Sequence, residues 1–401
     1  MRILLLSETL CAGGAELFVV RLANALAKGG HDVIIGVMNG EMVHPGVAGR
    51  IDPTVAVERA FQPAKRSLHR ADRMLRALRI DLPLIHRMQR RWLDAIVRRW
   101  KPDVVHSHLV KADWLAAVVK RRIGGFRHVL TVHGEQIAYT ERSASPQMLK
   151  YERRLQETLG QADGIAVISD EQERHFGELY QVAGTAITRI YNGYEKPASD
   201  AGWPSRARLG LPDDKIIFGM VSRGIPEKGW GEAIAAFERI RRDDSVLVLL
   251  GEGPFFDQLD KLPDGVILPG FTANPIEWIR NFDIGLLPSR YVGESLPTVI
   301  VEYLMCGVPV IASDIGEISK MMRTSDGELA GVMIAGSYPC PIIGELADAM
   351  ELLADDGVLR QRLATRAIAA SQKFDMAVCI EQYERLYRPD HRVPHSRESV
   401  D

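Results

Sequence analysis

Short apolar runs alternate with helical segments over most of the sequence, and the order repeats in both halves. In the first half these runs predict strands at residues 2–6, 32–37, 103–108, 128–134, 164–169 and 187–191. In the second half they predict strands at residues 215–221, 246–254, 266–271, 282–287 and 310–312. Runs that are apolar throughout are typical of parallel strands covered on both faces. The pattern therefore predicts two α/β units.

Glycine and proline mark where the helices between these strands begin and end. Helices are predicted at residues 15–27, 170–180, 230–241, 298–305 and 374–387. Gly29 and Gly30 stop the first of them, and Gly307 stops the fourth. Pro297 precedes the fourth helix, where a missing N–H costs nothing. Residues 196–212 are rich in proline and small residues, which predicts a linker between the two units.

Size, charge and cysteine content narrow the class of protein. With 401 residues the chain is long enough for two domains that each bury a core. A net charge of −2 argues against a general nucleic-acid binder, because that function needs a basic excess. The cysteines are scattered, which fits a reducing compartment and excludes a zinc knuckle; they are Cys11, Cys306, Cys340 and Cys379. No run of about twenty apolar residues occurs, so we expect a cytoplasmic protein that does not span a membrane.

Residues 65–101 form a strongly basic segment in which apolar residues recur at helical spacing. A basic amphipathic helix can lie on an anionic membrane surface, with its arginines near the headgroups. The alternative is a pair of solvated helices docked on the first unit. In the first case the protein is peripheral on the inner face of the cell membrane.

Two glutamates flank the predicted start of the helix after Pro297. Glu294 precedes the helix, and Glu302 lies within its apolar run. A helix N-terminus offers free N–H groups and a positive dipole, which suit an anion. This arrangement is expected for a nucleotide diphosphate. Its phosphates would lie at the helix start, one carboxylate would bind the group beyond the phosphates, and the other would bind the two ribose hydroxyls. The alternative is that Glu294 is a solvated loop residue and Glu302 an ordinary ion-pair partner.

Two further turns carry residues suited to a phosphate ligand. Arg223 and Lys228 bracket a turn at the carboxyl end of a predicted strand, so both can bend back onto one anion. Gly13 and Gly14 stand at a strand-to-helix turn, where glycine lets the backbone approach a ligand closely. Each has a plain alternative: a surface loop for the cations and a tight turn for the glycines.

Histidines end two of the predicted strands. His106 and His108 close the strand at 103–108, and His133 ends the next one. In an open parallel sheet, ligands bind at the carboxyl ends of the strands, which is where His133 falls. Three neighbouring histidines also suit a metal, but no carboxylate or cysteine accompanies them at ligand spacing. His106 and His108 are more typical of structural or acceptor-side residues.

Taken together, these motifs resemble a known family of enzymes. Glu294, seven intervening residues, Glu302 and the following Gly307 and Pro309 resemble the signature of the family-4 (group 1) retaining glycosyltransferases, which have the GT-B fold. Other matching segments are Gly13–Glu16, Asn192–Gly193, Arg223 with Lys228, Gly251 with Gly253, Pro269–Gly270 and residues 374–387. The resemblance covers nearly the whole chain and is weakest between residues 40 and 101.

The resemblance implies an α/β protein with two Rossmann-like domains that face a cleft. Residues 1–196 would form the acceptor-binding domain and residues 197–372 the nucleotide-sugar-binding domain. Residues 373–388 would form a helix that crosses back to the first domain. Residues 389–401 would be a disordered tail.

The resemblance also implies the roles of individual residues. The donor would be a nucleotide-diphospho-sugar of the UDP or GDP type, with no metal and no other cofactor. Arg223 and Lys228 would neutralise its diphosphate, and Glu302 would hold its ribose. His133 and Glu294 would act at the transferred sugar as the catalytic residues. Further donor contacts would come from Gly13, Gly14, Pro269, Gly270, Ser295, Leu296, Pro297 and Thr298.

The implied reaction is retaining transfer of a hexose-type sugar to a hydroxyl of a glycan or lipid-linked acceptor, in cell-surface polysaccharide or lipopolysaccharide biosynthesis. Two alternatives stay open: a small-molecule acceptor, and an inactive partner subunit that binds nucleotide sugars. A sugar-nucleotide epimerase would need its own acid and base carboxylates. A phosphorylase would need a cofactor-binding lysine context that the sequence does not show.

Overall fold

A computed structural model describes the protein at residues 1–11, 13–60, 84–134, 154–180, 186–197, 202–255, 262–291, 294, 296–335 and 342–388. The chain forms two compact units. The first consists of Met1–Tyr194 together with Met376–Asp401, and the second of Glu195–Asp375. The predicted tail, 389–401, and the part of the basic segment before residue 84 lie outside the described residues.

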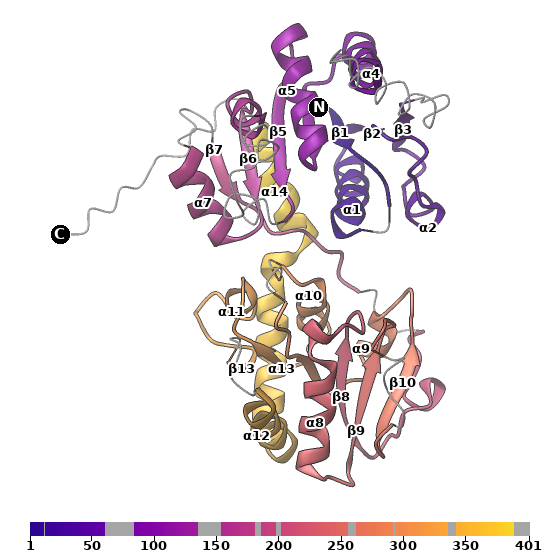
Figure 1. Ribbon diagram of the computed structural model, residues 1–401, viewed down its shortest axis with the longest axis vertical. Helices are drawn as coiled ribbons and strands as arrows, with labels where there is room; N and C mark the ends of the chain where they lie inside the picture. The colour runs from indigo at the N-terminus through magenta and orange to yellow at the C-terminus, as the bar shows by residue number, and fades with distance from the viewer. Residues whose placement is uncertain are drawn as a thin grey trace, which may run out of the picture. The chain divides into compact units, whose positions relative to one another are not determined.

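The first unit is built on a parallel sheet of seven strands (Figure 1). In chain order these are β1 (Arg2–Ser7), β2 (Asp32–Val37), β3 (Ala56–Arg59), β4 (Val104–His108), β5 (Arg127–Val132), β6 (Gly164–Val167) and β7 (Ala186–Arg189). Across the sheet the order is β3-β2-β1-β4-β5-β6-β7. The chain thus runs outward from β1 in one direction and then from β4 in the other, as in a doubly wound fold.

Alternating residues of β1 show why the strands are apolar throughout. Ile3 and Leu5 belong to a core with α1 (Gly14–Lys28) and α14 (Met376–Tyr387). Leu4 and Leu6 belong to a second core with α4 (Leu84–Trp100) and α5 (Val110–Ile123). Successive side chains point to opposite faces of a strand, so a sheet covered on both faces needs apolar residues at every position.

Helix α14 belongs to the first unit although it closes the chain. Its residues Cys379, Tyr383 and Leu386 are buried in the same core as β1 and α1. Gly193 leaves room for this packing, because a Cβ there would lie 2.7 Å from Cβ of Cys379. The helix therefore packs on the same core as β1 and α1.

The second unit has a six-stranded parallel sheet in the order β10-β9-β8-β11-β12-β13 (Figure 1). Its strands are β8 (Ile216–Val221), β9 (Ser245–Leu250), β10 (Val266–Gly270), β11 (Ile284–Leu287), β12 (Val310–Ser313) and β13 (Gly331–Ile334). One face packs on α8 (Trp230–Ile240) and α12 (Ile342–Asp355). The helices α10 (Thr298–Met305) and α13 (Gly357–Ser371) pack against each other. Two doubly wound units confirm the predicted α/β class.

Two predictions about local structure need correction. The linker predicted at 196–212 is wrong in its second part, because the Arg206 guanidinium donates to the Asp283 carboxylate at 2.8 Å and fixes this segment on the second unit. Strands β3 and β13 were not predicted; in β3 the polar residues Glu58 and Arg59 hide the pattern. Within the described residues, no helix combines the length and the apolar character that crossing a membrane requires.

Candidate active site

The order of strands in the second sheet puts the point where the winding changes direction between β8 and β11. The chain winds from β8 to β9 and β10 on one side, and from β11 to β12 and β13 on the other. Connections that leave in opposite directions open a crevice at the carboxyl ends of the two central strands, where ligands of such sheets bind. The loops that follow β8 and β11 carry six of the residues singled out from the sequence: Arg223, Lys228, Glu294, Ser295, Leu296 and Pro297.

These two loops are held together through their backbones. The amide of Arg290, after β11, donates to the carbonyl of Glu227, after β8, at 2.7 Å. Gly229 has φ +86°, and a Cβ on it would lie 2.2 Å from the Pro288 carbonyl oxygen. Only glycine fits such a contact at such a φ. The loop after β8 is therefore fixed against the loop after β11.

Lys228 and Glu294 form an ion pair that joins the loops after β8 and β11. The ammonium contacts Oε1 of the carboxylate. The side chains are only 13% and 6% exposed. Ser289, which is fully buried, donates from Oγ to the same Oε1 at 3.0 Å. The Lys228 ammonium also lies 4.9 Å from the centre of the Tyr291 ring. Glu294 is thus a partnered buried carboxylate, and the alternative of a solvated loop residue is wrong.

The other predicted donor residues of this unit lie at the same edge of the sheet. Arg223 is the second residue after β8 and is exposed. Pro269 and Gly270 end β10, and the Gly270 carbonyl accepts from the Gly251 amide at 3.0 Å. Because parallel strands end together, these residues share one edge with Lys228 and Glu294.

Helix α10 begins at the same edge. Pro297 is its N-cap, and no side chain caps its first turn. Thr298 is exposed at the first position, and Leu296 is half-buried. Free N–H groups at a helix start favour an anion. Glu302 is half-buried within the helix. Ser295 lies outside the described residues, so its predicted contact stays a prediction.

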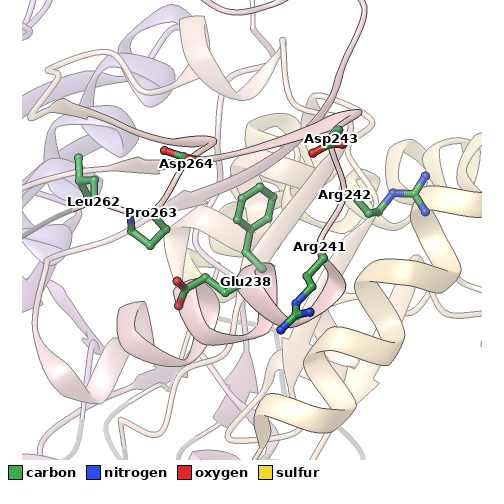
Figure 2. Close-up of a pocket in the computed structure, with 8 residues that line it drawn as sticks. Glu238, Arg241, Arg242, Asp243, Leu262, Pro263 and Asp264 are labelled. Carbon is green, nitrogen blue, oxygen red and sulfur yellow. The ribbon is translucent and has the colours of Figure 1, made fainter.

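A surface depression lies at the opposite edge of this sheet (Figure 2). Its volume is about 470 Å³. Its lining residues are Phe237, Glu238, Arg241, Arg242, Asp243, Leu262, Pro263 and Asp264. They precede β9 and β10 or end α8, so they stand at the amino ends of the strands. Arg242 points away to bind Asp355 of α12. This depression is separate from the crevice that holds Lys228.

In the first unit, the corresponding switch of direction falls between β1 and β4. Gly13 is the N-cap of α1, and Gly14 is its first residue. Glu16 bends back over this turn, since its carboxylate accepts from the Thr9 hydroxyl at 2.7 Å. Gly13 is tightly placed, because a Cβ there would lie 2.4 Å from Oε2 of Glu16.

His133 follows β5, next to β4, and is paired with His108. Nδ1 of His108 lies 2.9 Å from Nε2 of His133. The remaining ring nitrogen of each is buried and has no partner among the described residues. Burial lowers the pKa of His133 to about 4 and that of His108 well below its ordinary value. Both rings are neutral at pH 7, so His133 offers a hydrogen bond and no positive charge.

His106 connects the sheet to α14. Its ring nitrogens lie 2.7 Å from the Tyr387 hydroxyl and 2.7 Å from the Thr131 hydroxyl. The Thr131 hydroxyl is in turn 2.8 Å from that of Tyr383. This chain of buried hydrogen bonds identifies His106 as a structural residue. Within the described residues, no cluster of histidine, cysteine, aspartate and glutamate side chains has the arrangement of a metal site.

A buried carboxylic acid near this network was not foreseen from the sequence. Asp113 of α5 is 3% exposed, and its Oδ1 has no partner among the described residues. Burial raises its pKa to about 8, against a hydrogen bond with Ser107 that lowers it. Asp113 is therefore mostly neutral at pH 7.

The free energy of unfolding should report this protonation. An unfolded aspartate ionises near pH 3.8 and the folded one near pH 8. Between these values only the folded state holds the proton, so the stabilisation that Asp113 contributes falls as pH rises, by up to about 1.4 kcal/mol per pH unit. Asp113→Asn should remove this slope in urea unfolding between pH 4 and pH 8. The exposed Asp213→Asn is the control, and parallel curves for wild type and Asp113→Asn would contradict the assignment.

Two family models match the chain and together span most of it. The model described as Glycosyltransferase Family 4 matches residues 12–196, and the model described as Glycosyl transferases group 1 matches residues 203–370. The fold and the site thus define a GT-B glycosyltransferase. The chain belongs to the family-4 (group 1) glycosyltransferases, which confirms the resemblance found in the sequence.

Solved structures share this fold. A glycosyltransferase from Rickettsia africae has a TM-score of 0.73 and 16% identity, over 96% of this chain and 97% of that one. Anabaena HepE in complex with UDP-glucose has a TM-score of 0.68 and 21% identity, over 96% of this chain and 98% of that one.

The curated relatives differ in what they act on. Teichuronic acid biosynthesis glycosyltransferase TuaC of Bacillus subtilis is 28% identical over 58% of this chain and 59% of that protein. Alpha-D-kanosaminyltransferase of Streptomyces kanamyceticus is 34% identical over 46% of this chain and 48% of that protein. These two alignments thus cover about half of each relative. Glycogen synthase of Mycobacterium tuberculosis is 28% identical over 93% of this chain and 90% of that protein.

Proposed function

We propose that this protein transfers a hexose-type sugar from a UDP- or GDP-sugar to a hydroxyl of a glycan or lipid-linked acceptor, with retention of configuration. The observation that carries the proposal is the pairing of Lys228 with Glu294 at the switch point of the second sheet. A cation for the diphosphate and a carboxylate for the sugar then stand side by side. HepE, which has the same fold, was solved with UDP-glucose bound.

The chemical demand of the reaction is to stabilise a departing diphosphate. Lys228, Arg223 and the free N–H groups of α10 are positive groups at one edge of the sheet. Groups already oriented toward developing negative charge lower the barrier without reorganising. They supply the charge that a metal ion supplies in other transferases, so we propose that transfer needs no added metal.

The sugar would be held by hydrogen bonds. Glu294 accepts hydrogen bonds from hydroxyls of the transferred sugar, and Glu302 binds the ribose of the nucleotide. The resemblance implies that His133 also acts at the transferred sugar, and its ring, neutral at pH 7, would supply a hydrogen bond. Retention would follow from attack of the acceptor on the face that the diphosphate leaves, with a phosphate oxygen taking the acceptor proton.

The acceptor class is inferred from the relatives. TuaC supports a cell-surface polysaccharide, and we place the protein in polysaccharide or lipopolysaccharide biosynthesis. Alpha-D-kanosaminyltransferase supports the second candidate, a small-molecule acceptor. The remaining alternative is an inactive subunit that only binds nucleotide sugars. Detection of turnover would exclude it.

The test is the release of UDP or GDP from a panel of nucleotide sugars, with water or a hydroxyl acceptor. We expect slow hydrolysis of at least one donor, unchanged by EDTA. Nucleotide sugar binding without hydrolysis or transfer, across a broad panel of acceptors, would favour the inactive subunit. Loss of turnover in EDTA, restored by a divalent ion, would contradict metal independence.

We further propose that α4 contacts an anionic membrane surface. Arg87, Arg91 and Arg98 are exposed on this helix, while Leu93 and Val97 are buried against the sheet. The arginines form one basic stripe, since residues four and seven apart lie on one side of a helix. Such a stripe attracts anionic headgroups, by about 1 kcal/mol per charge near the surface.

Flotation with vesicles of anionic lipid at low salt tests this contact. Replacing the three arginines by glutamine should reduce the bound fraction several-fold. A matched variant removes three exposed arginines elsewhere, Arg208, Arg323 and Arg362. Equal binding by the two triple variants, or no binding by the wild type, would show that α4 is only a solvated surface helix.

A further inference from the structure

The ion pair between Lys228 and Glu294 must break if Lys228 is to bind the diphosphate of the donor. Lys228 is assigned to the diphosphate and Glu294 to the sugar, yet in this structure each is the other's partner. The carboxylate neutralises the ammonium that the diphosphate needs. Lysine is a single compact charge on a flexible stem, so it can move from one anion to another.

We infer that Lys228 exchanges Glu294 for the diphosphate when the donor binds, and that Ser289 holds Glu294 in place after the exchange. This inference rests on the function proposed above. It makes Glu294 a competitor of the diphosphate until the sugar hydroxyls reach it, and it makes Ser289 a positioning residue of the donor site.

The geometry of Ser289 suits this role. Its Oγ accepts from the Tyr291 amide at 3.2 Å, so one lone pair is occupied. Its proton points to Oε1 of Glu294 at 3.0 Å, whereas the Glu227 carbonyl is more distant at 3.4 Å. Both groups that hold Glu294, the Lys228 ammonium and the Ser289 hydroxyl, contact Oε1. When Lys228 leaves, the serine still fixes this oxygen.

A buried carboxylate without its cation is costly unless other donors satisfy it. The hydroxyls of the transferred sugar are such donors, whereas a free nucleoside diphosphate has none at that place. Only the intact donor therefore supplies hydroxyls that replace the contact that Glu294 loses when Lys228 leaves. Because Glu294 competes for the Lys228 ammonium, the wild-type protein should bind the nucleoside diphosphate less tightly than a protein without the Glu294 charge.

The first test measures UDP and GDP binding by titration calorimetry. Glu294→Gln removes the competing charge, so the affinity for the accepted nucleoside diphosphate should rise about tenfold, while donor hydrolysis falls. Glu294→Gln is then introduced into Lys228→Met. Competition for Lys228 predicts no gain in that background, whereas simple repulsion between Glu294 and phosphate predicts the same gain.

The outcomes separate this inference from the proposed function. Equal or weaker binding by Glu294→Gln, in a protein whose wild type binds UDP or GDP and hydrolyses a donor, overturns the exchange alone. A tenfold gain that persists in the Lys228→Met background overturns it as well. A wild type that binds neither nucleotide and hydrolyses no donor overturns the proposed function, and the inference with it.

The second test addresses Ser289. Ser289→Ala should leave the affinity for the nucleoside diphosphate within about twofold and lower kcat for donor hydrolysis about tenfold, since it removes one hydrogen bond to a charged group. Ser289→Thr, which keeps the hydroxyl, should restore most of the rate. Ser245→Ala is the control, because Ser245 is also buried but starts β9, at the amino edge of the sheet.

Thermal unfolding of each variant shows whether it is folded before its kinetics are compared. An unchanged kcat in folded Ser289→Ala would overturn the positioning role. An equal loss in Ser245→Ala would also overturn it, because the effect would then be one of general packing.

Discussion

Replacing Lys228 by methionine should lower the rate of sugar transfer about 10²- to 10³-fold, the usual loss when one oriented group that stabilises developing charge is removed. The methionine keeps the length of the stem and removes the charge. The Lys228 side chain is only 13% exposed, so water screens its charge little and its attraction for a diphosphate is strong. Affinity for the nucleoside diphosphate should fall in parallel with the rate.

Lys215→Met is the matched control for this substitution. Lys215 immediately precedes β8, at the opposite end of the strand whose loop carries Lys228. The same charge is removed from the same unit, but at the amino edge of the sheet. Turnover and nucleotide affinity should be unchanged there. Wild-type kinetics in Lys228→Met, or equal losses in both variants, would contradict the role given to Lys228.

Substituting alanine for Gly229 should damage the same site through the backbone. Gly229 has φ +86°, where a side chain is strained, and its Cβ would lie 2.2 Å from the Pro288 carbonyl oxygen. The loops after β8 and β11 must then separate. We expect a loss of about 2–4 kcal/mol in the free energy of unfolding, since strain and a backbone clash combine. Nucleotide binding should weaken as well.

Gly231→Ala provides the comparison for this variant. Gly231 is in the first turn of α8, two residues away, and a Cβ there would meet only the Phe255 ring at 3.6 Å, an ordinary contact. Its stability should change little, because alanine suits a helix. Urea unfolding and calorimetric titration of both variants decide the matter. Equal stability of the two variants would show that the loops do not depend on the Gly229 contact.

Much of the fold could be predicted from the sequence because its signals are local. A strand covered on both faces, such as β1, is apolar at every position, and Gly307 and Pro297 mark the ends of α10. These patterns depend only on neighbouring residues. Strand β3 has polar residues at half of its positions and therefore gave no such signal.

The sequence predicted individual residues of the site, but it did not predict the contacts between them. Lys228 and Glu294 each stood in a recognisable motif, but 66 positions separate them in the chain. Only the neighbouring positions of β8 and β11 bring them together, and strand order does not follow from periodicity. Ser289 gave no signal, because one serine after a strand is common in any loop. Asp113 gave none either, since its burial depends on the packing of α5 against the sheet.

The most direct test of the account is an experimental structure of the protein with the nucleoside diphosphate of its accepted donor. We predict that the diphosphate lies within hydrogen-bonding distance of the Lys228 ammonium and the first turn of α10, with the ribose at Glu302. A nucleotide bound elsewhere, for example in the depression beside Glu238 and Arg241, would contradict the assignment of the donor site.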